Sequence, residues 1–188
     1  MSILSFLKRY ITKPRTVGAV APSSRYLARK MMHSIDFATA SVIAEFGAGT
    51  GVFTEEIIKK RAQGTLMLVF ETDEQFFDIL VKKYSNQPDC HIINDSAAQV
   101  GKYLEMHGHT HADYIVSGLP FASLPPQVSR SILSGAREHL AAGGRFITFQ
   151  YTLLKKDFIG EYFSDITITR EVRNIPPAYV LSCTNGPR

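Results

Sequence analysis

The sequence predicts an α/β fold, in which a mostly parallel sheet of seven strands carries helices on both faces and ends in an antiparallel strand pair. Two observations predict this fold. Short apolar runs alternate with helical patterns through most of the 188 residues, as expected for buried parallel strands joined by crossover helices. A glycine-rich turn follows the first run, at the carboxyl end of a strand, where sheets of this kind bind ligands.

The elements follow in order along the chain. Apolar runs predict the first five strands, and each run is separated from the next by a pattern with helical spacing. The strands are expected at 41–46, 65–71, 90–95, 113–119 and 145–151, and the helices at about 25–34, 54–62, 73–84, 97–104 and 126–140. The sequence "AAGG" (141–144) predicts a turn before the fifth strand. Segments 165–172 and 178–184 predict the closing antiparallel pair.

The N-terminal segment 3–13, "ILSFLKRYITK", has apolar residues at helical spacing and basic residues mostly on the other side. Pro14 ends this predicted amphipathic helix. The following "VGAVAPSSR" reads as a loop, in which Ser23 or Ser24 can cap the helix at 25–34. We expect one domain over residues 1–188, with an N-terminal helix and lid at about 1–34.

Composition sets only broad limits. The net charge of +4 weakly favours anionic partners such as a nucleic acid or an anionic membrane. No apolar run approaches the ~20 residues of a membrane span, and no signal peptide is evident. Cys90 and Cys183 form no CxxC motif, which indicates reduced thiols in a cytoplasmic protein. If a membrane is involved, the protein lies on its surface.

The glycine-rich turn lies in "VIAEFGAGTGVFTEEI" (42–57), where Gly47, Gly49 and Gly51 follow Glu45. Glycines between a strand and a helix let a ligand approach the backbone closely. Close packing of strand against helix can also select glycine, so the turn alone is weak evidence.

Carboxylates strengthen the case, because Glu45, Glu71 and Asp95 end three successive predicted strands. An acid about 20 residues after such a turn binds ribose hydroxyls. Negative charge along one edge poorly suits a pyrophosphate, but it suits a ligand with an ammonium, a ribose, an adenine and a sulfonium. A nicotinamide dehydrogenase is the alternative, although Gly51 departs from its usual GxGxxG spacing.

The sequence resembles the class I S-adenosylmethionine-dependent methyltransferases from about Val17 to its end, with "EFGAGTG" matching their cofactor loop. The resemblance implies a Rossmann-like fold. It also implies that Gly47 and Gly49 pass under the methionine part, that Glu45 holds the ammonium through water or backbone, that Glu71 binds both ribose hydroxyls and that Asp95 binds the adenine amine. Further cofactor-binding residues that it implies are Ser23, Ser24, Thr72, Ser96 and Ser117.

The methyl acceptor of this class binds near the end of the fourth strand, where "SGLPF" (117–121) resembles the "N-[LI]-P-[YF]" motif of the ribosomal RNA adenine dimethyltransferases. Their asparagine binds the target amine, but Gly118 stands in its place and has no side chain for that contact. Ser117 is one position away and faces the other side of the strand. The departure argues against an adenine substrate. Alternatively, the motif is a turn with an aromatic ring packed beneath it.

A closer resemblance is to the bacterial phospholipid N-methyltransferases, through "VGAVAPSSRYLARKM", "VSGLPF", "FQYT" and "NIPPAYV". It implies methylation of phosphatidylethanolamine towards phosphatidylcholine, a lid at 20–24 and an acceptor site near Tyr151. By resemblance and position, Tyr26, Phe121 and Tyr179 are further candidates to hold the amine or take its proton.

We therefore expect a peripheral membrane enzyme whose N-terminal helix lies on an anionic bilayer. The same helix can instead pack on the domain as a lid. Two other functions stay open: a ribosomal RNA adenine N6-methyltransferase, and a non-catalytic module that binds S-adenosylmethionine. The histidines of "HGHTH" (107–111) can bind zinc in principle, but a polar loop is the simpler interpretation and we expect no metal.

Overall fold

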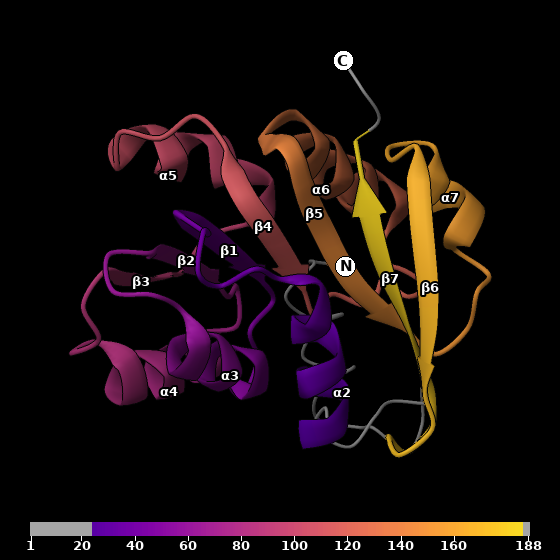
Figure 1. The fold of residues 1–188 in the computed structure, drawn as a ribbon, viewed down its shortest axis with the longest axis horizontal. Helices are drawn as coiled ribbons and strands as arrows, with labels where there is room; N and C mark the ends of the chain where they lie inside the picture. The colour runs from indigo at the N-terminus through magenta and orange to yellow at the C-terminus, as the bar shows by residue number, and fades with distance from the viewer. Residues whose placement is uncertain (1–23, 186–188) are drawn as a thin grey trace.

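The computed structural model describes residues 24–185, and within them it forms a seven-stranded sheet in the order β3-β2-β1-β4-β5-β7-β6 (Figure 1). Strands β1 to β5 are parallel, and β7 runs antiparallel to both β5 and β6. The predicted fold class is confirmed. The strands are β1 Val42–Phe46, β2 Leu66–Phe70, β3 Cys90–Ile93, β4 Ala112–Ser117, β5 Leu140–Gln150, β6 Asp165–Glu171 and β7 Ala178–Thr184.

Helices cover both faces of the sheet. The first face carries α2 (Arg25–Met31), α3 (Val52–Lys60) and α4 (Glu74–Tyr84), whose apolar residues share one core. The opposite face carries α5 (Val100–Met106), α6 (Pro126–Glu138) and α7 (Lys156–Gly160). Short 3₁₀ turns at Met32–Ser34 and Ala97–Gln99 flank α2 and α5. The central strands are buried throughout, as β1 and β2 show, because both of their sides face a helical layer.

The predicted turn at 141–144 is wrong, because these residues lie within β5. Ala112 pairs with Leu140 and Tyr114 pairs with Arg145, so the chain bulges out between the two pairs without leaving the strand. Gly143 has a φ of 76°, which the left-handed backbone of such a bulge requires. The sequence also did not predict α7, which at five residues is too short to show a helical period.

The predicted N-terminal helix at 3–13 and residues 20–23 of the predicted lid at 20–24, Ser23 among them, lie outside the described residues. No helix in the described part of the chain is long and apolar enough to cross a membrane. The "HGHTH" segment lies between α5 and β4, as expected of a loop. Within residues 24–185, no three histidine, cysteine or acidic side chains form a group that could hold a metal ion.

Candidate functional site

The sheet changes direction of winding at β1, whose neighbours are β2 on one side and β4 on the other. In open α/β sheets the ligand binds beyond the carboxyl ends of the strands at this switch point. Backbone hydrogen bonds fix the loops that leave those ends. The Gly47 amide donates to the Phe70 carbonyl at 2.9 Å, and the Gly118 amide donates to the Phe46 carbonyl at 2.8 Å.

The glycine loop between β1 and α3 has a left-handed backbone at all three glycines, with φ values of 71° at Gly47, 55° at Gly49 and 82° at Gly51. Packing explains Gly51, because a Cβ there would lie 2.9 Å from a Leu80 side-chain carbon. Gly49 differs, since no atom of the described residues other than its chain neighbours lies within 4 Å of the position that its Cβ would take. The backbone at Gly49 is therefore open to a ligand.

Glu45, the fourth residue of β1, is fully buried. Neither of its carboxylate oxygens makes a hydrogen bond of ordinary geometry within the described residues. Burial raises its pKa from 4.5 to about 8; Thr54 opposes that shift and the charge of Glu71 adds to it. A buried carboxyl group without a partner is costly. Its burial at this point, next to a second acid, indicates a site for a cationic group.

Glu71 directly follows β2 and is 7% exposed. Its Oε2 accepts a hydrogen bond from the Gly49 amide at 2.7 Å, and its Oε1 accepts one from the Asp73 amide at 2.9 Å. Burial raises its pKa, and the amides oppose that shift. Because each carboxylate oxygen has two lone pairs, Glu71 can also accept hydrogen bonds from two ligand hydroxyls. Glu71 thus connects the glycine loop to the end of β2.

Asp95 lies beyond β3 and is more exposed than the two glutamates. Its Oδ1 accepts from the Ser96 amide at 2.7 Å, and its Oδ2 accepts from the Tyr103 hydroxyl at 2.9 Å. Lys102 lies 3.8 Å from the same Oδ2. Ser96 caps the following 3₁₀ turn by accepting from the Ala98 amide. These contacts hold Asp95 in place at the outer end of the row of carboxylates that Glu45, Glu71 and Asp95 form along the sheet edge.

The remaining predicted cofactor residues lie on the same edge. Thr72 is half-buried between Glu71 and Asp73. Ser117 ends β4, is fully buried, and its hydroxyl accepts from the Leu119 amide at 3.3 Å. Ser24 is the N-cap of α2, where its hydroxyl accepts from the Leu27 amide at 3.2 Å.

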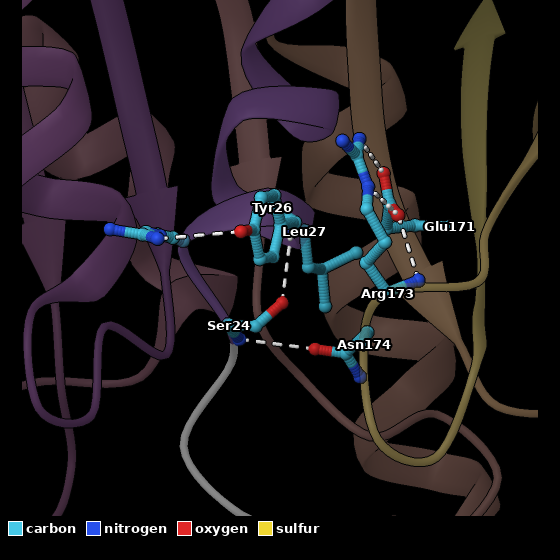
Figure 2. Close-up of polar contacts among 7 residues, drawn as sticks. Ser24, Tyr26, Leu27, Glu171, Arg173 and Asn174 are labelled. Carbon is cyan, nitrogen blue, oxygen red and sulfur yellow. Dashed lines mark hydrogen bonds and ion pairs between the residues drawn. The ribbon is translucent and has the colours of Figure 1, made fainter.

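Figure 2 shows how Ser24 and α2 are attached to the turn between β6 and β7. The Ser24 amide donates to Oδ1 of Asn174 at 3.0 Å, and Nδ2 of Asn174 donates to the Pro176 carbonyl at 2.7 Å. Asn174 is 2% exposed. This asparagine thus joins the start of the described chain to a turn 150 residues later.

Two arginines flank Tyr26 in the same region. Arg173 lies over the Tyr26 ring, with its guanidinium carbon 4.6 Å from the ring centroid. Arg25 donates to the Tyr26 hydroxyl at 3.3 Å and lowers its pKa. Arg173 also binds Glu171 through its backbone amide, Nε and Nη2, at 2.9 to 3.0 Å, and holds the pKa of Glu171 at about 2. The cluster places positive charge beside Tyr26 (Figure 2).

The four predicted acceptor residues fall on two sides of the sheet. Tyr26, on α2, and Tyr151, whose ring packs edge-on against Phe149 at 5.5 Å, lie on the face covered by α2 to α4. Tyr179 packs on the other face. Phe121 is fully buried in that second core, with its ring 6.2 Å from that of Phe146. The structure thus places Tyr26 and Tyr151 on one side of the sheet and Phe121 and Tyr179 on the other.

The residues present fit S-adenosylmethionine. The buried carboxyl group of Glu45, which makes no hydrogen bond of ordinary geometry within residues 24–185, can bind an ammonium group. A second carboxylate with acceptor capacity left (Glu71) can bind ribose hydroxyls. The bare Gly49 backbone lies beside Glu71, to which its amide donates. Sequence reasoning missed Thr54 below Glu45 and the role of Asn174, which lies in the "NIPPAYV" segment.

The sheet order, the switch-point loop and its carboxylates together define a class I methyltransferase. The model of the ribosomal RNA adenine dimethylase family matches residues 23–156. The chain belongs to this family and is an S-adenosylmethionine-dependent methyltransferase.

Two curated relatives differ in how much of their length the chain matches. An ornithine lipid N-methyltransferase of Singulisphaera acidiphila is 29% identical over 95% of this chain and 93% of its own length. The ribosomal RNA small subunit methyltransferase A of Thermotoga neapolitana is 26% identical over 70% of this chain and 48% of its own length. The chain thus spans about half of that ribosomal RNA relative.

Solved structures support the fold. A T. thermophilus 16S rRNA methyltransferase in complex with S-adenosylmethionine and guanosine superposes with a TM-score of 0.65, at 19% identity, over 91% of this chain and 45% of that chain. A Bacillus cereus O-methyltransferase superposes with a TM-score of 0.65, at 13% identity, over 97% of this chain and 90% of that chain. At these identities the likeness concerns the fold alone.

Proposed function

We propose that this enzyme transfers methyl groups from S-adenosylmethionine to the primary amine of a membrane-lipid headgroup, converting phosphatidylethanolamine towards phosphatidylcholine at the membrane surface. The relative that aligns over nearly its whole length is named as a lipid N-methyltransferase, and this supports a lipid amine as the acceptor. In this proposal the chain acts as one methyltransferase domain, with residues 1–34 as its helix and lid.

The observation that carries the proposal is the environment of Gly118, which follows β4. A Cβ at Gly118 would lie 2.7 Å from the Gly47 carbonyl oxygen, closer than side-chain carbons approach. The backbone of the cofactor loop therefore occupies the space of any side chain there. The family's adenine-specific enzymes have an asparagine at the matching position, so an acceptor other than adenine is favoured.

In this proposal, Glu45 binds the methionine ammonium, the Gly47 and Gly49 backbone lies under the methionine, Glu71 binds the ribose and Asp95 the adenine amine. S-adenosylmethionine supplies, when bound, a methyl group activated by a sulfonium. The chain's own residues then have to bind, orient and exclude water, since positioning accounts for much of the rate of such transfers.

The acceptor arrives as an ammonium, because an alkyl ammonium has a pKa near ~10.4 in water, and it must lose a proton before its lone pair can attack the methyl group. Removal from water next to positive charge lowers that pKa. Arg25 provides such charge beside Tyr26, whereas Glu171 offsets the charge of Arg173. We propose Tyr26 and Tyr151 as the rings that hold the neutral amine through hydrogen bonds and its ammonium form through cation–π contact, because both lie on the side of the sheet that α2 covers.

The test is incubation of the full chain with methyl-labelled cofactor and three separate acceptors: vesicles with phosphatidylethanolamine, vesicles with ornithine lipid, and 16S ribosomal RNA. We expect label in phosphatidylethanolamine. Label in ornithine lipid alone would keep the lipid amine but change the headgroup. Label in RNA alone would refute the proposal in favour of adenine methylation, which the family model supports. Glu71→Gln serves as the variant with impaired cofactor binding.

A further inference from the structure

The large apolar side chains that are exposed in the described chain are unevenly distributed. Four of the six lie in two loops. Val172 and Ile175, which are 64% and 81% exposed, lie in the β6–β7 turn; Leu153 and Leu154, which are 39% and 85% exposed, lie between β5 and α7. A cluster of this kind marks an interaction surface more often than isolated apolar residues do.

The two loops leave the sheet next to each other. The last residue of β5, Gln150, pairs with Tyr179 at the start of β7, and Glu171 at the end of β6 pairs with Ala178. Both loops therefore lie at the carboxyl edge of the parallel strands, the edge that carries Glu45 and Glu71. In Figure 1 the β6–β7 turn lies at the bottom of the molecule, whereas α5 lies at the top.

Two polar side chains at the β6–β7 turn are buried and hold the turn in place. Glu171 and Asn174 are each 2% exposed, and Arg173 and Ser24 supply hydrogen bonds that hold them. The apolar Val172 and Ile175 point outward between these anchors. This arrangement inverts the usual distribution of polar and apolar residues, so the turn presents apolar side chains on a fixed backbone.

Basic residues flank the apolar ones along the chain. Arg170 and Arg173 lie on the hairpin, Arg25 on α2, and Lys155 and Lys156 follow Leu154. Glu171 neutralises Arg173, and Asp157 follows the lysines, which leaves the surface positive. Apolar side chains flanked by cations match an anionic bilayer, where the apolar side chains enter the acyl boundary and the cations meet lipid phosphates. Single-stranded RNA would instead require exposed rings for stacking.

We propose that Val172, Ile175, Leu153 and Leu154 form a docking rim that inserts into an anionic lipid bilayer and holds the carboxyl edge of the sheet against it. This inference rests on the proposed function and deepens it, since it states which surface of the enzyme meets the lipid. The rim is distinct from the N-terminal segment 3–13.

The test measures flotation of the full chain with vesicles of phosphatidylcholine and phosphatidylglycerol, which contain no primary amine and so report docking alone. The variant V172S/I175S removes two apolar side chains without changing charge. Each such side chain contributes substantially to the free energy of membrane binding when it is buried in the bilayer. We therefore expect the lipid concentration at which half of the protein floats to rise about tenfold. Leu154→Ser tests the second loop separately and is expected to weaken flotation in the same direction.

The matched control is I79S/M106S, which removes two other exposed apolar side chains, 44% and 68% exposed. Ile79 lies on α4, at the β3 end of the sheet, and Met106 ends α5. We expect this control to float like the unchanged chain. Equal flotation of the unchanged chain, V172S/I175S and Leu154→Ser would overturn the docking rim, as would a complete failure of the unchanged chain to float.

A second readout separates this inference from the proposed function. In detergent micelles of phosphatidylethanolamine no bilayer has to be docked, so V172S/I175S should label lipid at the rate of the unchanged chain. If no lipid is labelled in any form while flotation still depends on the rim, the docking surface stands and the proposed substrate is wrong. An RNA gel shift together with no flotation would show that the chain binds nucleic acid rather than a bilayer, and would overturn docking.

Discussion

Replacing Glu45 with glutamine tests the reasoning on the cofactor site most directly. Glu45 is fully buried, lacks a hydrogen bond of ordinary geometry within residues 24–185, and has a pKa that burial raises to about 8. Glutamine has nearly the same shape and carries no charge at any pH. Glu45→Gln therefore removes the titration and leaves the packing largely intact.

The sign of the effect on stability follows from the direction of the shift. Unfolded Glu45 loses its proton near pH 4.5, whereas folded Glu45 keeps it up to about pH 8. Between these values the folded chain binds more protons than the unfolded chain, so the free energy of unfolding falls as the pH rises. At about 1.4 kcal/mol per pKa unit, the loss across this window is on the order of 4–5 kcal/mol.

Urea unfolding measured from about pH 5 to about pH 8 gives the comparison. We expect the unchanged chain to lose stability across this range more steeply than Glu45→Gln, so that the variant becomes the more stable protein at the alkaline end. The control is Glu74→Gln, which replaces an exposed glutamate at the start of α4. Parallel stability curves for the unchanged chain and Glu45→Gln would refute the assigned environment of Glu45.

Cofactor binding provides the second measurement. A cationic group placed beside Glu45 favours the charged carboxylate, so binding near neutral pH should expel up to about one proton. Calorimetry in buffers with different heats of protonation measures this number. We expect proton release from the unchanged chain and none from Glu45→Gln, which should also bind more weakly. Equal proton release from both proteins would show that the cofactor does not contact Glu45.

Three further substitutions test other contacts. Glu71→Gln turns one acceptor oxygen into a donor facing a backbone amide, so cofactor affinity should fall by about tenfold to a hundredfold in calorimetry, while Glu74→Gln keeps it; equal affinity would argue against the ribose contact. Gly118→Ala places a carbon 2.7 Å from the Gly47 carbonyl oxygen, so both the thermal unfolding midpoint and the cofactor affinity should fall. If neither changes, the glycine loop can move aside without cost. Asn174→Ala removes the buried contacts between α2 and the β6–β7 turn, at a cost of about 1–3 kcal/mol in urea unfolding; no measurable loss would mean that this contact contributes little.

The fold and the row of carboxylates could be predicted because they depend on features local in the sequence. Glu45 and Glu71 each lie at the end of an apolar run, and parallel strands bring their carboxyl ends to one edge. The glycine loop lies between the first strand and its helix for the same reason. These relations need no knowledge of how distant segments pair.

The rest of the site depends on how strands and loops far apart in the sequence pair, and local sequence patterns do not predict that pairing. Tyr151 and Tyr179 lie on opposite faces because Gln150, not Tyr151, pairs with Tyr179 in the antiparallel ladder. The contact between Ser24 and Asn174 joins residues 150 positions apart. The bulge in β5 depends on the backbone at Gly143 rather than on any apolar period.

A lipid acceptor places different demands on this edge from those of a nucleotide base. A base arrives by diffusion, so polar groups in the pocket must hold and orient it. A lipid amine is already confined to a plane, and docking of the enzyme fixes its height and direction relative to the cofactor. One explanation then covers both the missing side chain at Gly118 and the apolar rim around Val172 and Ile175. The membrane orients the acceptor amine, so no side chain at position 118 has to hold it by a hydrogen bond. On this argument, restoring asparagine at Gly118 would not create an adenine methyltransferase, because it would displace the Gly47 backbone while leaving the rim directed at a bilayer.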